Sequence, residues 1–204
     1  NEGIANHFEQ YVKEGGNLIL GVMSGIKSWS NTMVDTPWPG VFGDLAGIRV
    51  DEFEVIPNRL HNTISYRGKE YKVNGWLDML SCKTASSLAV YTGKFYAGKI
   101  AIARNQYGMG TVTYMGVMNN DELVQDILMD LYKERNYPFT MLPENLYVTQ
   151  RVSEKATYTF AVNMGYEPVR FMVDKPGKDI LYDTYVSGEV LVKGREVLIV
   201  RAER

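Results

Sequence analysis

The fold is decided by the stretch GKIAIARNQYGMGTVTYMGV, residues Gly98–Val117. Residues 99–104 are apolar on both faces until the arginine that ends them, and residues 111–117 are rich in β-branched and aromatic side chains. Asn105 and two glycines lie between these runs and tolerate positive φ, so the stretch predicts two strands around a tight turn. A strand that is apolar on both faces needs cover on both sides, which favours a layered α/β domain.

An amphipathic helix is expected directly after this stretch, ending near Arg135. Asn119 or Asn120 can cap its N-terminus, because a short amide side chain accepts hydrogen bonds from the first free backbone N–H groups. Its apolar residues recur at helical spacing: Leu123, Ile127, Leu128 and Leu131. This stripe would lie on the sheet to which the hairpin belongs.

The segment far upstream of the hairpin is typical of the middle of an alternating β/α pattern. A helix over 4–14 ends at Gly15-Gly16 and leads into the apolar strand 17–22, as in a parallel sheet covered on both faces. We therefore expect the chain to be a fragment of a longer protein, N-terminally truncated, whose earlier strands precede Asn1.

A long loop over 23–40 follows that strand, and it carries Trp29 and Trp38. Open α/β sheets bind ligands outside the carboxyl ends of their strands, and loops of this length in compact domains tend to be functional. Beyond this loop the sequence predicts extended segments over 48–56, 62–81 and 88–91.

The clearest boundary lies at residues 136–143, where two prolines interrupt the chain and helical periodicity ends. We therefore divide the chain into an α/β domain, residues 1–140, and an all-β domain, residues 141–204. Six short strands are expected in the second domain, over 146–152, 157–163, 169–173, 180–185, 189–192 and 196–201. Strands of this length and spacing indicate a small antiparallel sandwich or barrel.

Composition excludes several classes of function. The 204 residues carry a formal net charge of −2, whereas a nucleic-acid platform is normally clearly basic. No apolar run approaches the ~18 residues of a membrane span, so no membrane partner is expected. The single cysteine, Cys82, excludes an internal disulfide and a multi-cysteine metal site, and we read the compartment as cytoplasmic.

Polar residues give weak signals for chemistry. The two histidines, His7 and His61, are far apart and no acids cluster with them, so no metal site is expected. Asp51, Glu52 and Glu54 are best interpreted as a solvated strand surface, because acidic side chains are mostly exposed. No pattern in the chain implies a cofactor.

Several stretches together resemble the β-galactosidases of glycoside hydrolase family 42. Those similar to the family's trimerisation domain are Phe8–Leu20, Ser24-Gly25, Pro39-Gly40, Asp44–Ile48, Glu52-Phe53, Tyr96–Lys99 and Ala103–Gly110. Those similar to its C-terminal β domain are Leu142–Leu146 and Phe160–Asn163. The resemblance covers nearly the whole chain in order, which makes it more specific than any one of these motifs.

The resemblance implies a fold and a function. Enzymes of this family consist of a TIM barrel, a flavodoxin-like α/β domain and a small all-β domain, and they form homotrimers. This chain would hold the later part of the α/β domain, which is similar to class I glutamine amidotransferases, and all of the β domain. The family hydrolyses terminal β-D-galactosides with retention, using two glutamates on the barrel. No catalytic residue is therefore assigned to this chain, which we expect to be a non-catalytic assembly portion.

Two alternatives remain open. The terminal β domain and the tryptophans could form a carbohydrate-binding module. An amidotransferase-like enzyme would instead use Cys82 as its nucleophile, although Leu80–Thr84 lacks the glycine-flanked turn that exposes such a residue. If the family's trimer is adopted, the loop 23–40 is the best candidate for the subunit contact or a sugar-proximal surface, with Trp29 and Trp38 as its key residues.

Overall fold

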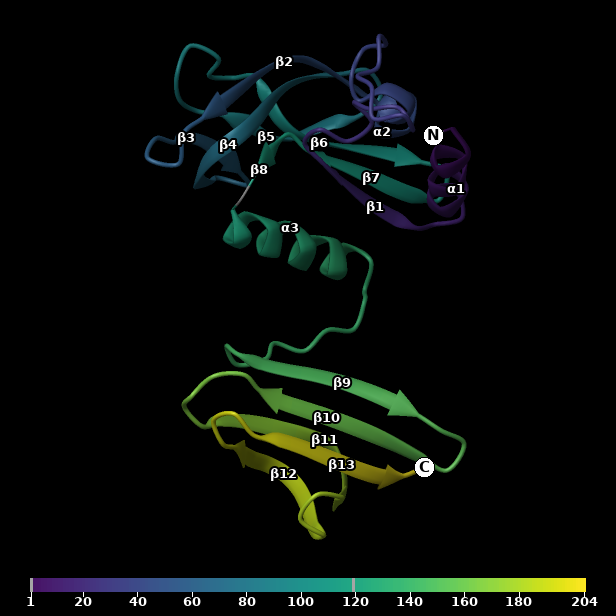
Figure 1. Ribbon diagram of the computed structural model, residues 1–204, viewed down its shortest axis with the longest axis vertical. Coiled ribbons are helices and arrows are strands. Elements are labelled where there is room, and N and C mark those ends of the chain that lie inside the picture. Colours follow the sequence, from purple (N-terminus) through teal and green to yellow (C-terminus); the bar gives the residue numbers. More distant parts are fainter. Residues whose placement is uncertain (1, 119) are drawn as a thin grey trace. The chain divides into compact units, whose positions relative to one another are not determined.

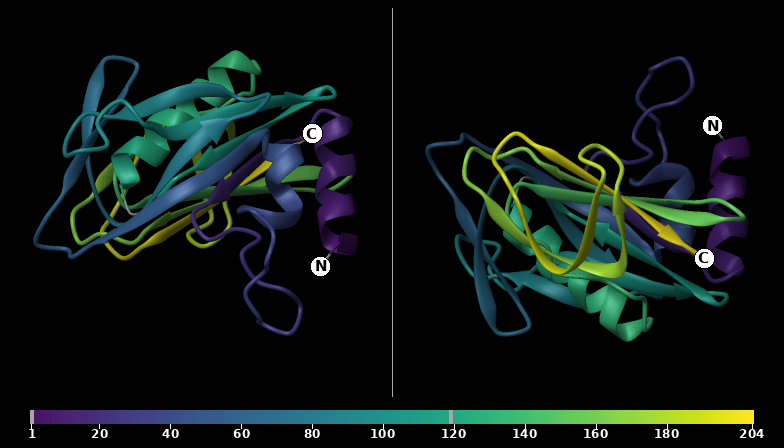
Figure 2. Two further views of the ribbon diagram at one scale, coloured as in Figure 1. Left: turned by 90° about the horizontal axis from the view of Figure 1, so that it is seen from above. Right: turned by 90° about the horizontal axis from the view of Figure 1, so that it is seen from below.

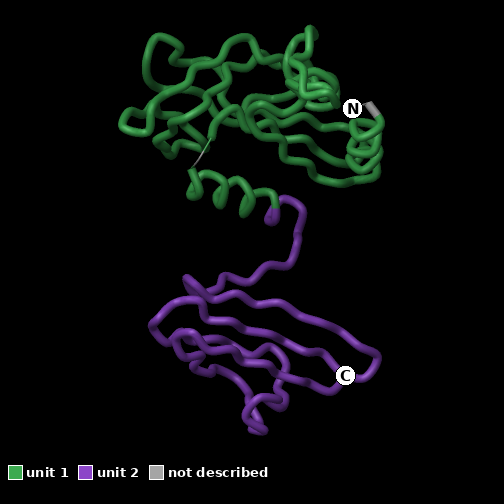
Figure 3. Tube along the Cα trace, in the orientation of Figure 1, with its two compact units in different colours: residues 1–131 green, residues 132–204 purple. Residues whose placement is uncertain are grey.

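The computed structural model describes residues 2–118 and 120–204, which form two compact units divided between Leu131 and Tyr132 (Figure 3). Strands make up 49% of the chain and helices 16%, so both units are mostly β. The elements of the first unit are α1 (Glu2–Lys13), β1 (Asn17–Gly21), η1 (Gly40–Phe42), α2 (Gly43–Ala46), β2 (Ile48–Ile56), β3 (Asn62–Tyr66), β4 (Lys69–Cys82), β5 (Ser86–Tyr91), β6 (Ile100–Tyr107), β7 (Gly110–Met115), β8 (Val117–Met118) and most of α3 (Asp121–Glu134).

The predicted hairpin is present as β6 and β7, near the middle of the first sheet (Figure 1). The two strands pair in antiparallel register from Ile102 opposite Met115 to Tyr107 opposite Gly110. Every residue of β7 is buried. Two apolar clusters cover the hairpin: Ile102 belongs to one and Ala103 to the other, so it is enclosed as its composition requires.

The first sheet differs from the flavodoxin-like α/β fold that the resemblance implied. Its strand order is β1-β7-β6-β5-β3-β4-β2, with β8 paired to β4. Among the strand pairs that the described residues form, only β1 with β7 is parallel. The flavodoxin-like expectation is therefore not supported. Parallel strands need long crossovers, whereas residues 48–91 turn back through short connections and pair antiparallel.

Helix α3 packs on the first unit through its predicted apolar stripe. Leu123 and Ile127 are fully buried in the core. Leu128 was expected in the same stripe, but it is 37% exposed. The Oδ1 atom of Asn120 accepts a hydrogen bond from the backbone N–H of Leu123 at 2.8 Å and so caps the helix. Asn119, the other candidate cap, lies outside the described residues, as does Asn1.

Tyrosine–carboxylate contacts fix the same helix to the sheet. The Tyr66 hydroxyl donates to Asp130 at 2.8 Å, and the Tyr71 hydroxyl donates to Asp126. Burial and the neighbouring Asp130 carboxylate raise the pKa of Tyr66 to about 12, so this phenol stays a donor across the physiological range. Among the described residues no helix is long and apolar enough to cross a membrane.

The second unit is a single antiparallel sheet in the order β12-β11-β13-β10-β9. Its strands are β9 (Leu146–Val152), β10 (Ala156–Asn163), β11 (Val169–Asp179), β12 (Thr184–Val192) and β13 (Val197–Glu203). Seven apolar residues from all five strands form its core: Leu146, Ala161, Phe171, Val173, Val192, Leu198 and Val200.

The prediction of six strands in this unit is wrong, because two of the expected turns lie inside strands. Residues 175–177 lie inside β11, where a bulge absorbs them, and pairing with β12 resumes at Gly177 opposite Val186. Gly188, which falls between the expected strands 180–185 and 189–192, lies inside β12 with a φ of 68°. The actual turn comes at residues 180–183, within a segment that was expected to be a strand.

A buried carboxylate lies at the centre of the first unit. Asp78 in β4 is 1% exposed, and its two oxygens accept hydrogen bonds from the Trp76 indole at 2.7 Å and the Tyr114 hydroxyl at 2.9 Å. The Tyr91 hydroxyl donates to the backbone oxygens of Asp78 at 2.9 Å and Gly116 at 3.2 Å. Burial raises the pKa of Asp78, and the two side-chain hydrogen bonds oppose that effect.

The start of β7 also packs tightly against helix α1. A Cβ atom at Gly110 would collide with the backbone oxygens of Gly16 and Val12. Val12 is the fully buried contact of α1, while the adjacent Tyr11 is 52% exposed. The missing side chain at position 110 therefore lets the end of the helix approach the sheet.

Replacing Asp78 with asparagine should change how stability depends on pH. Because the folded state raises the pKa of this carboxyl, it holds the proton more tightly than the unfolded chain does. Asp78 therefore weakens folding increasingly as pH rises from about 3.9, its ordinary value, through the raised folded-state pKa. The free energy of unfolding of Asp78→Asn relative to the wild type should rise over that window in urea titrations.

Tryptophan fluorescence is the measurement for this variant, because Trp29, Trp38 and Trp76 all lie in the first unit. The control is Asp35→Asn, which removes the same charge from an exposed position. A difference between Asp78→Asn and the wild type that stays constant with pH contradicts the prediction.

Replacing Gly110 with alanine should destabilise the first unit by about 1–3 kcal/mol, because the added methyl group must displace backbone. Gly21→Ala is the matched control: it lies in the neighbouring strand β1 and a Cβ there meets nothing within 4 Å. The measurement is the urea midpoint followed by tryptophan fluorescence. Equal midpoints for the two variants would show that the contact with α1 tolerates a side chain.

Candidate functional site

The loop between β1 and η1 carries the two tryptophans singled out in the sequence. Backbone hydrogen bonds from Ser28 to Thr32 at 2.8 Å and from Val34 to Ile26 at 3.0 Å fold its middle into a small hairpin. Trp29 lies near the tip of this hairpin and is 87% exposed. Figure 2 shows the loop, in indigo, projecting from the first unit.

Trp38 lies at the base of the same loop and is placed against β2. Its backbone oxygen accepts a hydrogen bond from the N–H of Val50 at 2.9 Å. Its indole stacks on the ring of Phe53, with ring centroids 5.6 Å apart and an angle of 27° between the planes. The loop end is therefore fixed to the sheet by both backbone and side-chain contacts.

Three aromatic rings form one stack on this part of the sheet. Phe53 stacks in turn on Trp76, with centroids 4.4 Å apart and planes within 7° of parallel. We call Trp38, Phe53 and Trp76 the aromatic stack. Its middle ring, Phe53, is 49% exposed, and Val55 beside it on β2 is 58% exposed. Such an exposed apolar surface marks an interaction site more often than a lone exposed residue does.

The aromatic stack is connected to the buried network of the first unit. Trp76 donates its indole N–H to Asp78, whose other oxygen accepts from Tyr114 in the core. The hydrogen bond to Asp78 therefore sets the orientation of Trp76. Phe53 stacks on Trp76, and Trp38 stacks on Phe53. A surface whose rings are held in place loses little conformational entropy when a partner covers it.

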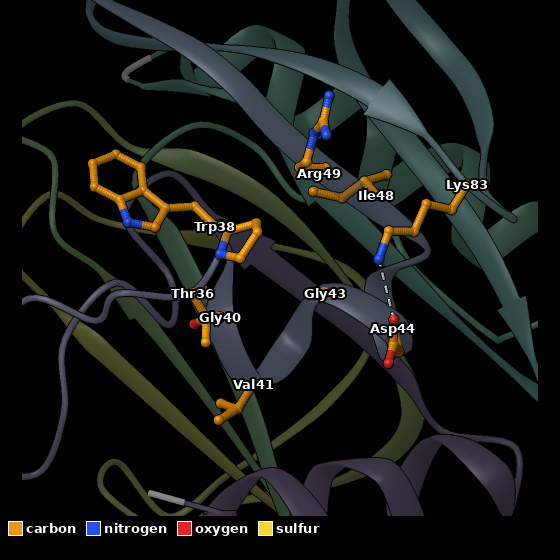
Figure 4. Close-up of a pocket in the computed structure, with 10 residues that line it drawn as sticks. Thr36, Trp38, Gly40, Val41, Gly43, Asp44, Ile48, Arg49 and Lys83 are labelled. Carbon is orange, nitrogen blue, oxygen red and sulfur yellow. Dashed lines mark hydrogen bonds and ion pairs between the residues drawn. The ribbon is translucent and has the colours of Figure 1, made fainter.

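A hollow of about 220 Å³ lies beside Trp38 (Figure 4). Its polar lining includes Arg49, Asp44 and Lys83, and the Lys83 ammonium lies 3.3 Å from the Asp44 carboxylate. Figure 4 shows the Trp38 indole pointing away from this ion pair. The hollow is smaller than most ligand sites, and Asp44 is the one carboxylate among its lining residues. It therefore lacks the carboxylate pair that glycoside hydrolysis uses.

Cys82 does not have the geometry of an activated nucleophile. It is the last residue of β4 and pairs with Ile48 of β2, instead of occupying a strand-to-helix turn. Burial raises the pKa of its thiol, which is opposite to the shift that activates a cysteine.

Two acidic residues of β2, Asp51 and Glu54, are held by local contacts, and Glu52 between them is exposed. Asp51 accepts hydrogen bonds from Arg49 at 2.8 Å and from Ser81, and Glu54 accepts from Lys94 at 2.8 Å and from Tyr96. Within residues 2–118 and 120–204, no three His, Cys, Asp or Glu side chains gather in a way that could hold a metal ion.

Sequence reasoning identified Trp29 and Trp38 but missed the partners of Trp38. Phe53 was expected in a strand, and the alternation of buried Val50 with outward Phe53 was the signal that could have placed it on the surface. Asp78 carried no such signal, because an acidic residue in a strand is normally exposed. The structure brings Trp38, Phe53 and Trp76 together, and it leaves Trp29 at the loop tip, apart from them.

Comparison with protein families divides the chain in a similar way to its fold. Residues 1–138 match the model described as "Beta-galactosidase trimerisation domain". Residues 145–202 match the model described as "Beta-galactosidase C-terminal domain". The two matches lie on either side of the coil between α3 and β9.

Curated relatives are whole β-galactosidases. β-Galactosidase BgaA of Clostridium cellulovorans is 28% identical over 182 residues, which are 89% of this chain and 28% of that protein. β-Galactosidase BgaH of Haloferax lucentense is 31% identical over 164 residues, 80% of this chain and 24% of that protein. The chain thus spans less than a third of the length of these relatives.

Solved structures share the fold. The β-galactosidase from Bacillus circulans sp. alkalophilus superposes with a TM-score of 0.90 at 24% identity, over 98% of this chain and 31% of that one. Gan42B, a GH42 β-galactosidase, also gives 0.90 at 24% identity, over 100% of this chain and 30% of that one. With both family models matched in order, the chain belongs to the β-galactosidases of glycoside hydrolase family 42, in the region of their trimerisation and C-terminal domains.

Proposed function

We propose that this chain is the non-catalytic assembly portion of a homotrimeric β-galactosidase. The observation that carries the proposal is the aromatic stack, a pre-positioned apolar surface whose middle ring, Phe53, is exposed and which lies within the segment that matches a trimerisation domain. A TIM barrel takes about 250 residues. The 204 residues here are occupied by the two matched domains, so the barrel would belong to another part of the parent protein.

In this proposal the loop 23–40 and the aromatic stack meet a neighbouring subunit. Aromatic side chains dominate the buried centres of protein interfaces, and tryptophan is among the residues that contribute most binding energy. Trp38 would lie at the centre of the contact because Phe53 supports it. Trp29, exposed at the loop tip, would insert into the neighbouring surface.

The parent enzyme would hydrolyse terminal β-D-galactosides with retention, through two glutamates on its barrel. The substrate would therefore meet this chain only where the assembled trimer brings the loop 23–40 near a neighbouring active site.

We place the boundary between the two domains at residues 140 and 141, in the coil before β9. The proposal includes a cytoplasmic location, which the free thiol of Cys82 supports.

Sedimentation velocity tests the assembly role directly. The wild-type chain should sediment as a species of about three times 23.1 kDa. Trp38→Ala should weaken the association by about 30-fold or more, because a central aromatic contact contributes about 2 kcal/mol or more. Phe95→Ala is the matched control, since this aromatic residue is 86% exposed and lies in the β5–β6 connection of the same unit. A wild-type chain that remains monomeric at high concentration would refute the role.

An activity assay tests the absence of catalysis. The purified chain should not release nitrophenol from a nitrophenyl β-D-galactoside above the rate of the uncatalysed reaction, because in this proposal the two catalytic glutamates belong to the barrel of the parent enzyme. Hydrolysis that co-purifies with the chain and is lost in a variant of one of its own carboxylates would overturn the proposal.

A further inference from the structure

The second unit has its own hollow, of about 710 Å³, lined by residues of the segment before β9, of the β10–β11 turn and of the β12–β13 turn. The charged, amide, aromatic and thioether side chains that line this hollow belong to Glu144, Asn145, Met164, Tyr166, Glu167 and Arg195. Its volume is within the range of small-molecule sites, in contrast to the hollow beside Trp38. We propose that this hollow binds a neutral saccharide, one pyranose ring at Tyr166 with its hydroxyl groups towards the charged and amide side chains.

Three separate segments are joined to build the hollow. The N–H of Met164 donates to the backbone oxygen of Asn145 at 2.8 Å, and the N–H of Arg195 donates to that of Gly165 at 3.0 Å. These bonds connect the segment before β9, the β10–β11 turn and the β12–β13 turn. Asn145 and Arg195 both have positive φ, 63° and 62°, a conformation that non-glycine residues rarely adopt.

The β10–β11 turn is held from within by one buried amide. Asn163 is 1% exposed, and its Nδ2 atom donates to the backbone oxygens of Glu167 at 2.8 Å and Val192 at 3.0 Å. Its Oδ1 atom accepts from the N–H of Gly165 at 2.9 Å. With the amide saturated by backbone groups, the loop that carries Tyr166 is fixed before any ligand arrives, which lowers the entropy lost on binding.

Tyr166 supplies an aromatic surface that is held in place without being covered. Its side chain is 81% exposed, and the Arg195 guanidinium lies 4.3 Å from the ring centroid. The cation–π contact fixes the ring orientation from one side. Met164, 50% exposed, adds further apolar surface. A pyranose ring has an apolar C–H face that such a surface can cover.

The charges around the hollow select a neutral ligand. Glu144 and Glu167 would repel an anion, and Arg195 would repel a cation. The same set offers carboxylate oxygens as acceptors, guanidinium N–H groups as donors, and the Asn145 amide as both. Sugar hydroxyl groups are donors and acceptors at once, so a polyol without charge satisfies every group in this mixture. This inference concerns the second unit and does not depend on the assembly role of the first.

The test is titration of the 204-residue chain with lactose and with galactose, followed in ¹H–¹⁵N TROSY spectra. Saturable shifts should appear at the amides of residues 144–145, 163–167, 169 and 193–196 at sugar concentrations up to about 50 mM, well above the ~1 mM dissociation constant expected for a weak site. Tyr166→Ala should weaken binding about fivefold, because a stacked ring contributes of the order of 1 kcal/mol. Tyr185→Ala, an exposed tyrosine on β12 away from the hollow, should bind as the wild type does.

The outcomes separate the possible ligands and sites. Shifts confined to these segments with both neutral sugars, which need about fivefold more sugar for saturation in Tyr166→Ala and the wild-type concentration in Tyr185→Ala, support the inference. A parallel titration with galacturonate tests for an anion site. Shifts caused by galacturonate and not by the neutral sugars would overturn the inference. Shifts only at the aromatic stack, or none at the highest concentration, would also overturn it. Glu167→Gln provides a second variant, which should weaken binding of both sugars while leaving the spectrum of the free chain otherwise unchanged.

Discussion

The first unit depends on a carboxylate that is buried among neutral donors. Asp78 would be costly to bury alone, and it is stable in the core because the Trp76 indole and the Tyr114 hydroxyl satisfy both of its oxygens. The two donors belong to different parts of the unit: Tyr114 to the enclosed hairpin and Trp76 to the aromatic stack. One side chain thereby relates the interior of the sheet to the surface that we assign to assembly.

The two units use the same construction for different purposes. In each, a buried polar side chain is held by hydrogen bonds and fixes an aromatic residue nearby: Asp78 fixes the half-buried Trp76, and Asn163 fixes the loop of the exposed Tyr166. The aromatic stack offers a broad apolar surface suited to another protein. The hollow of the second unit offers one ring among charges of both signs, which suits a small polar ligand.

The sequence predicted local structure well and strand pairing poorly. The hairpin at residues 98–117 and the helix after it follow from periodicity and turn chemistry, which are local properties. The expectation of a mainly parallel sheet was not supported. An apolar run such as 100–103 indicates that both faces of a strand are covered, but it does not indicate which strand pairs with it. In the second unit, Pro176 and Gly177 have turn chemistry, yet pairing with β12 on both sides of the bulge keeps them inside one strand. The candidate site was half predicted: a loop tryptophan is visible in a sequence, whereas the partners that stack on it come from distant strands.

The bulge in β11 also affects how readily the edge of the second sheet can pair with another chain. Strand β12 lies at one end of the five-stranded sheet, so its outer backbone groups are open to pairing with another chain. Because β11 shifts register between Val173 and Gly177, and β12 passes through a left-handed residue at Gly188 opposite, this edge is bent. A foreign strand needs a straight ladder to extend the sheet, so the irregularity guards the edge against aggregation.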